Sequence, residues 1–118
     1  MNNGRQIADT IAQQLGGYGP MKAMLGVTGF VYAGPNESQE GSLTVIFKAK
    51  GCLVNNKQPN RFTVSLALDD TYTVTFGRLH GLKYTELQTT EGVYCDQLQT
   101  LVEGTLGLRT SLHRVTFA

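Results

Sequence analysis

The chain has 118 residues and a formal net charge of +1, with 41% hydrophobic and 16% charged side chains. This length suits one domain, residues 1–118, whose core needs no disulfide or metal for stability. No apolar run of about 18 residues occurs, and Met1–Arg5 lacks the start of a signal peptide. We therefore expect no membrane partner and a cytoplasmic location.

The first segment has the pattern of an amphipathic helix. Ile7, Ile11 and Leu15 recur at helical spacing. Asn3 suits the cap that precedes such a helix, and Gly16–Gly17 suits the left-handed residues that end one. We expect this helix to lie flat on a larger apolar surface, which a sheet would supply.

Turn and strand patterns follow this helix. Tyr18–Pro20 predicts a turn, and Met21–Leu25 predicts a short helical turn. Val27–Ala33 predicts a first strand, and the wholly polar segment Gly34–Gly41 predicts an exposed loop. A second strand is expected to start near Leu43, where apolar residues again alternate with others.

A hairpin in the middle of the chain is the clearest signal. Apolar and small polar residues alternate in Arg61–Leu68 and in Thr71–Phe76, on both sides of an Asp69–Asp70 turn. We expect one face toward the core, and the adjacent carboxylates suit a solvated turn better than a shared acid-base site. The inward set is Phe62, Val64, Leu66, Leu68, Tyr72, Val74 and Phe76. The opposite face would carry Thr44, Lys48, Arg61, Thr63, Ser65, Thr73, Thr75 and Lys83.

The last third of the chain predicts further elements. Gly77–Gly81 interrupts the alternation and has two interpretations: a bulge or corner between strands, or a loop that holds a phosphate or a partner carboxylate. A fifth strand is expected at Leu82–Thr89 and a helix from about Val93 to Gly104, with Gly107 at its C-terminal cap. Residues 113–118 would form a short terminal strand or a tail.

Together these elements predict a two-layer α+β domain. An antiparallel sheet of about five strands would carry the N- and C-terminal helices on one of its faces.

The charges are unevenly distributed along the sequence. Residues 42–85 contain six basic and two acidic side chains, whereas residues 86–103 contain four acidic side chains and no basic one. This pattern is typical either of solvated sheet and helix faces or of two distinct binding surfaces. The candidate nucleic-acid-binding residues are Lys48, Lys50, Arg61, Arg78 and Lys83. The candidate partner-binding residues are Glu91, Asp96, Glu103 and His80.

Stacking of single-stranded bases normally needs exposed aromatic side chains beside the cations. Tyr32 and Tyr84 are the candidates for that role, because the other aromatic residues of the sheet are assigned to the core.

No pattern for catalysis or metal binding stands out. Cys52, Cys95, His80 and His113 are too scattered for a zinc site, and neither cysteine lies in a CxxC spacing. We expect free thiols, with Cys95 filling a small space in the core or a groove. No catalytic residue, no metal ligand and no cofactor is predicted.

Several stretches carry a resemblance to a known family. They are Leu68–Tyr84, Glu91–Leu98 and Gly107–Leu112, preceded by Ile7–Ile11 and Gln14–Gly17. Over most of its length the chain resembles a family of small proteins encoded by bacteriophages and prophages. The family has no settled activity, so the resemblance implies a phage setting and a bacterial host, and it transfers no catalytic residue.

Two functional hypotheses follow from the sequence. The first is a non-enzymatic phage accessory protein that binds a host macromolecule, in one version to inhibit a host defence system. The alternative is a single-stranded nucleic-acid-binding module that acts in phage DNA metabolism. The partner would be a host protein or a nucleic acid, and association into a homodimer is left open.

Overall fold

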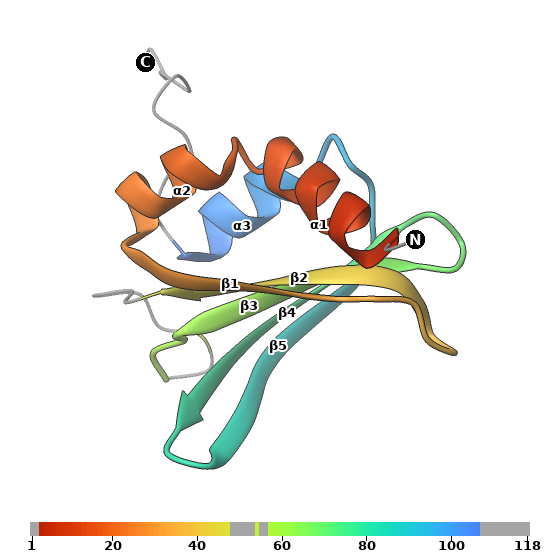
Figure 1. Ribbon diagram of the computed structural model, residues 1–118. Helices are drawn as coiled ribbons and strands as arrows, with labels where there is room; N and C mark the ends of the chain where they lie inside the picture. Colours follow the sequence, from red (N-terminus) through yellow and green to blue (C-terminus); the bar gives the residue numbers. More distant parts are fainter. Residues whose placement is uncertain (1–2, 48–53, 55–56, 107–118) are drawn as a thin grey trace.

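The computed structural model describes residues 3–47, 54 and 57–106 of the chain. Its elements are α1 (Asn3–Gln14), α2 (Tyr18–Leu25), β1 (Val27–Ala33), β2 (Gln39–Phe47), β3 (Arg61–Ala67), β4 (Tyr72–His80), β5 (Lys83–Val93) and α3 (Leu98–Leu106). The strands form one antiparallel sheet in the order β1-β2-β3-β4-β5, and the helices lie on one side of it (Figure 1). The predicted α+β architecture is confirmed.

The described helices are all short. Within the part of the chain that the structure describes, no helix combines the length and the apolar character needed to cross a membrane.

Helix α1 lies on the sheet through the predicted apolar stripe. Ile11 and Leu15 are fully buried, as are the two alanines between and before them. The helix ends where Gly16 and Gly17 adopt φ angles of 111° and 104°, which residues with a Cβ rarely reach. The Gly17 amide donates to the carbonyl of Ala12 at 2.7 Å and closes the last turn.

Helix α2 begins earlier than predicted. Tyr18–Pro20 is its first turn and not a separate turn, because proline fits the first helical turn, where its missing amide hydrogen would have no partner. The Tyr18 ring packs edge-on against the Phe30 ring, with their centroids 4.7 Å apart. The Tyr18 hydroxyl donates to an Asp9 carboxylate oxygen at 2.8 Å. Tyr18 therefore connects α2 to both α1 and β1.

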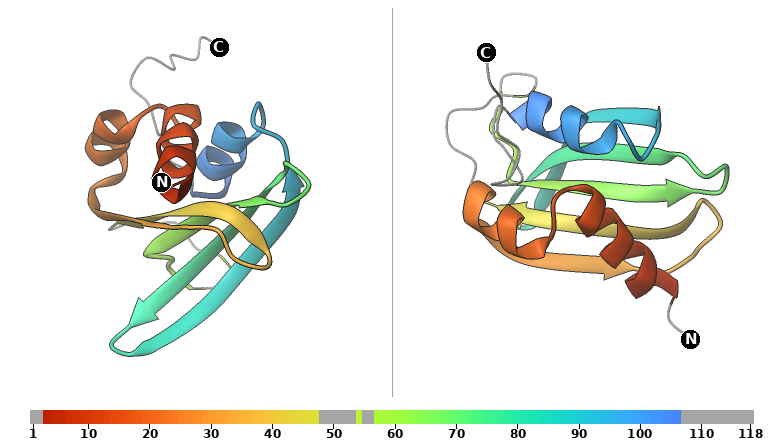
Figure 2. Two further views of the ribbon diagram at one scale, coloured as in Figure 1. Left: turned by 45° about the vertical axis from the view of Figure 1, so that its right-hand side comes forward. Right: turned by 90° about the horizontal axis from the view of Figure 1, so that it is seen from above.

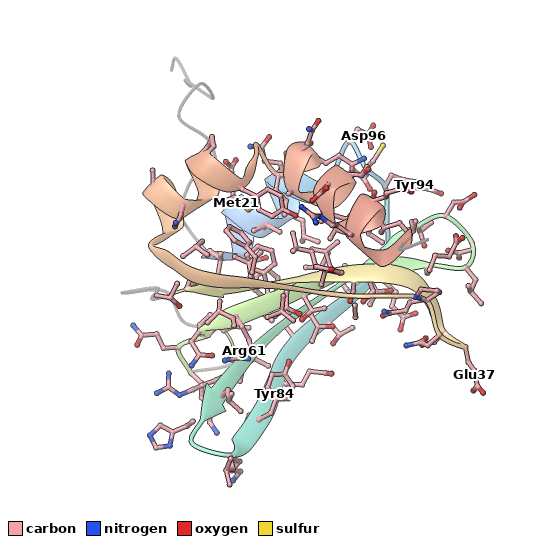
Figure 3. The ribbon with its side chains drawn as sticks, in the orientation of Figure 1. Met21, Glu37, Arg61, Tyr84, Tyr94 and Asp96 are labelled. Carbon is pink, nitrogen blue, oxygen red and sulfur yellow. The ribbon has the colours of Figure 1, made fainter. Side chains whose placement is uncertain are left out.

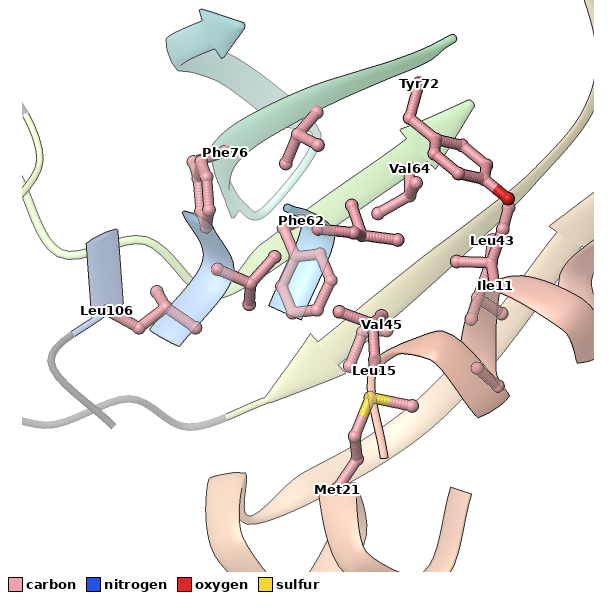
Figure 4. Close-up of a cluster of buried hydrophobic side chains, with 14 of the residues drawn as sticks. Ile11, Leu15, Met21, Leu43, Val45, Phe62, Val64, Tyr72, Phe76 and Leu106 are labelled. Atoms are coloured by element: carbon pink, nitrogen blue, oxygen red, sulfur yellow. The ribbon is translucent and has the colours of Figure 1, made fainter. Parts of the chain in front are cut away.

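The core lies between the helices and one face of the sheet (Figure 4). The rings of Phe47, Phe62 and Phe76 form a row of tilted contacts, with successive ring centroids 5.9 and 5.7 Å apart. The helix-side face carries Phe62 and Phe76, and the outer face carries Thr63 and Thr75.

The central hairpin has the predicted register, with one exception. Five members of the predicted inward set are buried, and Leu66 packs against them while partly exposed. Leu68 is 61% exposed, so its inward assignment is wrong. The reason is the turn, which contains Leu68, Asp69 and Asp70: Asp70 adopts φ 69°, and the Ala67 amide donates to the Thr71 carbonyl at 2.8 Å.

Asp69 stabilises this turn as predicted for a solvated carboxylate. One of its oxygens accepts hydrogen bonds from the Thr71 hydroxyl at 2.6 Å and the Thr71 amide at 3.1 Å. These bonds, the hydroxyl first, hold the pKa of Asp69 below its ordinary value.

The boundaries of β2 differ from the prediction. The strand begins at Gln39, so the expected exposed loop Gly34–Gly41 is shorter and its last three residues belong to the sheet. Gly41 is buried because Ile7 of α1 lies directly over it, where a Cβ would be 3.0 Å from the isoleucine side chain. In the remaining loop the Asn36 side chain accepts the amides of Ser38 and Gln39 at 2.8 and 3.1 Å.

The boundary between β5 and α3 also differs. β5 extends to Val93, and α3 begins only at Leu98, five residues later than predicted. Tyr94 is 61% exposed, and Cys95 is exposed instead of filling a small space in the core or a groove. Gly107, Cys52 and residues 113–118 lie outside the described residues.

The position of the core yields a matched pair of substitutions. Leu43→Ala removes a side chain that is 1% exposed, and we expect a loss of about 2–5 kcal/mol in the free energy of unfolding. Leu68→Ala makes the same chemical change in the exposed turn, with an expected effect within about 0.5 kcal/mol. Urea unfolding of both variants under one condition measures the difference. Equal losses would contradict the assigned register.

The Tyr18–Asp9 contact predicts an alkaline effect. Burial, followed by the Asp9 hydrogen bond, raises the pKa of Tyr18 from 10.0 to about 12. Because the folded state holds this proton more tightly, the contribution to stability is complete below pH 10 and is lost as pH rises through 12. The stability difference between the native protein and Tyr18→Phe should therefore shrink over this range in urea unfolding. Tyr94→Phe removes the same hydroxyl at an exposed position and is the control.

Candidate functional site

The hairpin of β4 and β5 continues beyond the end of β3. The last β3 pair is Arg61 with Gly77, whereas β4 and β5 go on pairing to His80 and Lys83. Residues 78–85 are called the β4–β5 arm below. The arm points away from the helices, and its tip is the turn at Gly81 and Leu82 (Figures 1 and 2).

The pairing of the arm tests the bulge interpretation of Gly77–Gly81. The segment is not a loop, because Gly77 to His80 are paired strand residues. The pairing changes register between Phe76 and Gly77, where Leu87 of β5 is the extra residue. The bulge interpretation is therefore confirmed, and Leu82 belongs to the turn instead of starting the fifth strand.

Asn60 holds the base of the arm. Its backbone amide donates to the Gly77 carbonyl at 3.0 Å. Its side-chain amide donates to the Leu79 carbonyl at 2.8 Å, while its side-chain oxygen accepts the Leu79 amide at 3.0 Å. The carboxamide thus replaces the strand pairing that β3 no longer provides. The Arg78 guanidinium adds a bond to the Gln58 carbonyl at 2.9 Å.

The helix-side face of the arm forms a basic pocket. The pocket has a volume of about 440 Å³ and is lined by Lys57, Gln58, Arg78, His80, Lys83 and Thr85. Alternate residues of β4 and β5 share this face, which brings Arg78 and Lys83 together. None of the described lining residues is acidic. The connection between Phe47 and Arg61 contains three lysines and no acid in its sequence.

The candidate nucleic-acid-binding residues do not all lie together. Arg78 and Lys83 share the basic pocket, and Lys83 is therefore not on the threonine face where it was predicted. Arg61 is on the outer face, because its cross-strand partner is Gly77 and its neighbour Phe62 faces the core. Lys48 and Lys50 lie outside the described residues.

Lys57 belongs to the pocket although it was not a candidate. In the sequence, Lys57 stood out only as a basic residue in the connection that precedes the hairpin. Its bridge to Val54 has no sequence pattern that would have predicted it.

The acidic candidates lie elsewhere. Glu91 and Asp96 line a second pocket of about 430 Å³ at the junction of β5 and α3, where Gly92 adopts φ 69°. Glu103 is on α3 and is not in the lining of that pocket. His80, which was grouped with the acids, is in the basic pocket at the other end of β5.

The outer face carries hydroxyl groups in register. Thr44, Thr63, Thr75 and Thr89 are successive cross-strand partners in β2 to β5. The hydroxyl oxygens are 2.8 Å apart in the first pair and 3.4 Å apart in the last. The predicted threonine face is confirmed, and Arg61 and Tyr84 lie at its arm end.

Among the described residues, no group of three or more His, Cys, Asp or Glu side chains has the geometry to hold a metal ion. No protein-family model matches the chain, and neither the curated proteins nor the solved structures include a significant match. The resemblance to phage-encoded proteins therefore stays a prediction from the sequence.

The Asn60 contacts predict local exchange behaviour. Asn60→Ala removes both side-chain hydrogen bonds to Leu79, each worth about 0.5–1.5 kcal/mol. We expect the Leu79 amide to exchange its hydrogen roughly 5- to 150-fold faster, while the Val74 amide in the sheet centre keeps its rate. Hydrogen exchange followed by NMR measures both amides. Asn36→Ala, in the distant β1–β2 loop, is the control. An unchanged Leu79 rate would show that Asn60 does not hold the arm.

Proposed function

We propose that the protein is a non-enzymatic nucleic-acid-binding module whose β4–β5 arm contacts the phosphate backbone. The observation that carries this proposal is the convergence of Lys57, Arg78 and Lys83 with His80 in one pocket whose described lining contains no acid. Three fixed positive charges at one site attract an anion more strongly than the net charge of +1 suggests, because Glu91 and Asp96 lie at the other end of β5 and Glu86 pairs with Gly77 on the outer face.

The chemistry of the pocket suits phosphate. Arginine offers a planar set of donors that matches phosphate oxygens, and lysine adds a compact charge on a flexible stem. The Gln58 carbonyl holds Arg78 at 2.9 Å, so the guanidinium loses less conformational freedom on binding. Screening limits such attraction to about 8–10 Å at physiological salt, so local clustering matters more than total charge.

A protein partner is the second candidate. Glu91 and Asp96 line one pocket beside the partly buried Leu101, and this favours a basic side chain of another protein as its occupant. The host-directed and anti-defence versions rest on the resemblance to phage-encoded proteins. A pull-down from bacterial lysate with Asp96→Asn as the matched variant tests this candidate. A partner retained equally by both proteins would contradict a role for this pocket.

The salt dependence of nucleic-acid binding should report the number of phosphate contacts. Each phosphate contact to a single strand contributes about 0.7 to the slope of log affinity against log salt. Lys57→Gln and Lys83→Gln should each weaken oligonucleotide binding and reduce the slope by about 0.7, as measured by fluorescence anisotropy at several salt concentrations. Lys22→Gln, an exposed lysine on α2, is the control and should leave the slope unchanged.

The proposal has a clear negative outcome. No binding of single-stranded or duplex oligonucleotides at low salt would remove it. Equal slopes in the Lys22, Lys57 and Lys83 variants would place any binding outside the arm.

A further inference from the structure

The outer face of the β4–β5 arm carries an exposed aromatic ring. Tyr84 is 47% exposed, and the phenol end of its ring lies over the backbone of Gly77. A Cβ at position 77 would come within 2.5 Å of the Tyr84 Cε1 and Cζ atoms. The glycine therefore allows the ring to rest on the strand while nearly half of the side chain stays in solvent.

Arg61 supplies a guanidinium group on the same face of the sheet as this ring. Arg61 is the cross-strand partner of Gly77, so its side chain leaves the sheet on the same face as Tyr84. Figure 3 shows both labelled side chains on the side of the sheet away from the helices. Burial raises the pKa of the Tyr84 phenol, the Glu86 carboxylate adds to the rise, and Arg61 opposes it. The ring is thus neutral at neutral pH, and Arg61 counters the charge of Glu86.

We propose that Tyr84 is a stacking site for an unpaired nucleotide base, which makes single-stranded nucleic acid the preferred ligand of the arm. This inference rests on the proposed function. An exposed aromatic ring beside a guanidinium is the usual platform for single-stranded bases. A duplex offers its phosphates to the basic pocket, but its bases are already stacked on one another.

The edge of the sheet connects the two faces of the arm. β5 is an edge strand, and its consecutive residues Lys83 and Tyr84 point to opposite faces. A single strand that crosses this edge can place a phosphate beside Lys83 and an adjacent base on Tyr84. Arg61 then lies on the same side as the stacked base, where its guanidinium can contact the base or the next phosphate.

Covering Gly77 is the alternative role for Tyr84. Aromatic rings often cover glycines in sheets, and such a ring would stabilise the strand pair without any ligand. The two roles differ in how the ring responds to nucleic acid, because only stacking on a base changes the electronic surroundings of the ring when the ligand binds.

The test uses a tryptophan at this position. The chain contains no tryptophan, so Tyr84→Trp gives fluorescence from one site. Single-stranded oligothymidylate should quench this fluorescence, and a duplex of equal length should quench it far less. Tyr32→Trp is the matched control, since Tyr32 is 45% exposed but lies on β1 at the other edge of the sheet. It should show no quenching.

Affinities separate this inference from the proposed function. Tyr84→Phe keeps the ring and should bind oligothymidylate like the native protein, whereas Tyr84→Ala should bind roughly 5- to 150-fold more weakly. Two results would overturn the stacking site and leave the proposed function standing. One is salt-dependent binding of Tyr84→Trp without quenching of its fluorescence. The other is equal affinity of Tyr84→Phe and Tyr84→Ala for oligothymidylate. Equal quenching by the duplex would overturn the single-strand preference. Absence of binding to any oligonucleotide would remove both.

Discussion

One extra residue in β5 determines the chemistry of both faces of the arm. Side chains alternate strictly along a strand, so one extra residue shifts every side chain beyond it to the other face. Leu87 is that residue, and it is 6% exposed. If Leu87 were absent from the pattern, side chains would alternate without interruption from Thr89, which is on the outer face. Lys83 would then be on the outer face, and Tyr84 would be on the helix-side face. With Leu87 present, Lys83 joins Arg78 in the basic pocket, and Tyr84 lies on Gly77.

The arm also needs support that the sheet does not provide. A two-stranded ribbon is marginally stable in water, and β3 stops pairing at Gly77. Asn60 extends the pairing through its carboxamide, and Arg78 adds a bond to Gln58. These contacts fix the connection before β3 against the arm, and that connection carries Lys57. The same bonds that hold the arm therefore also complete the basic pocket.

The sequence predicts the centre of this fold better than its ends. Alternation through Phe62 and Phe76 fixes the core face, because burial and strand period act together there. The errors occur where turn or bulge geometry overrides the pattern: Leu68 belongs to a three-residue turn, and Lys83 is shifted to the other face by Leu87. Lys57 could not be assigned from the sequence, since its place depends on the long-range Asn60 contacts.

Protection of a sheet edge is the simplest alternative explanation for the basic arm. Lysines on edge strands prevent pairing with other chains, and β5 is an edge. This explains Lys83, but Arg78 belongs to β4, which is paired on both sides at its base, and Lys57 comes from the connection before β3. Edge protection needs dispersed charges, whereas here three cations from three segments share one pocket and repel one another. That cost is relieved when an anion binds between them, and for this reason a ligand explains the cluster better than edge protection does.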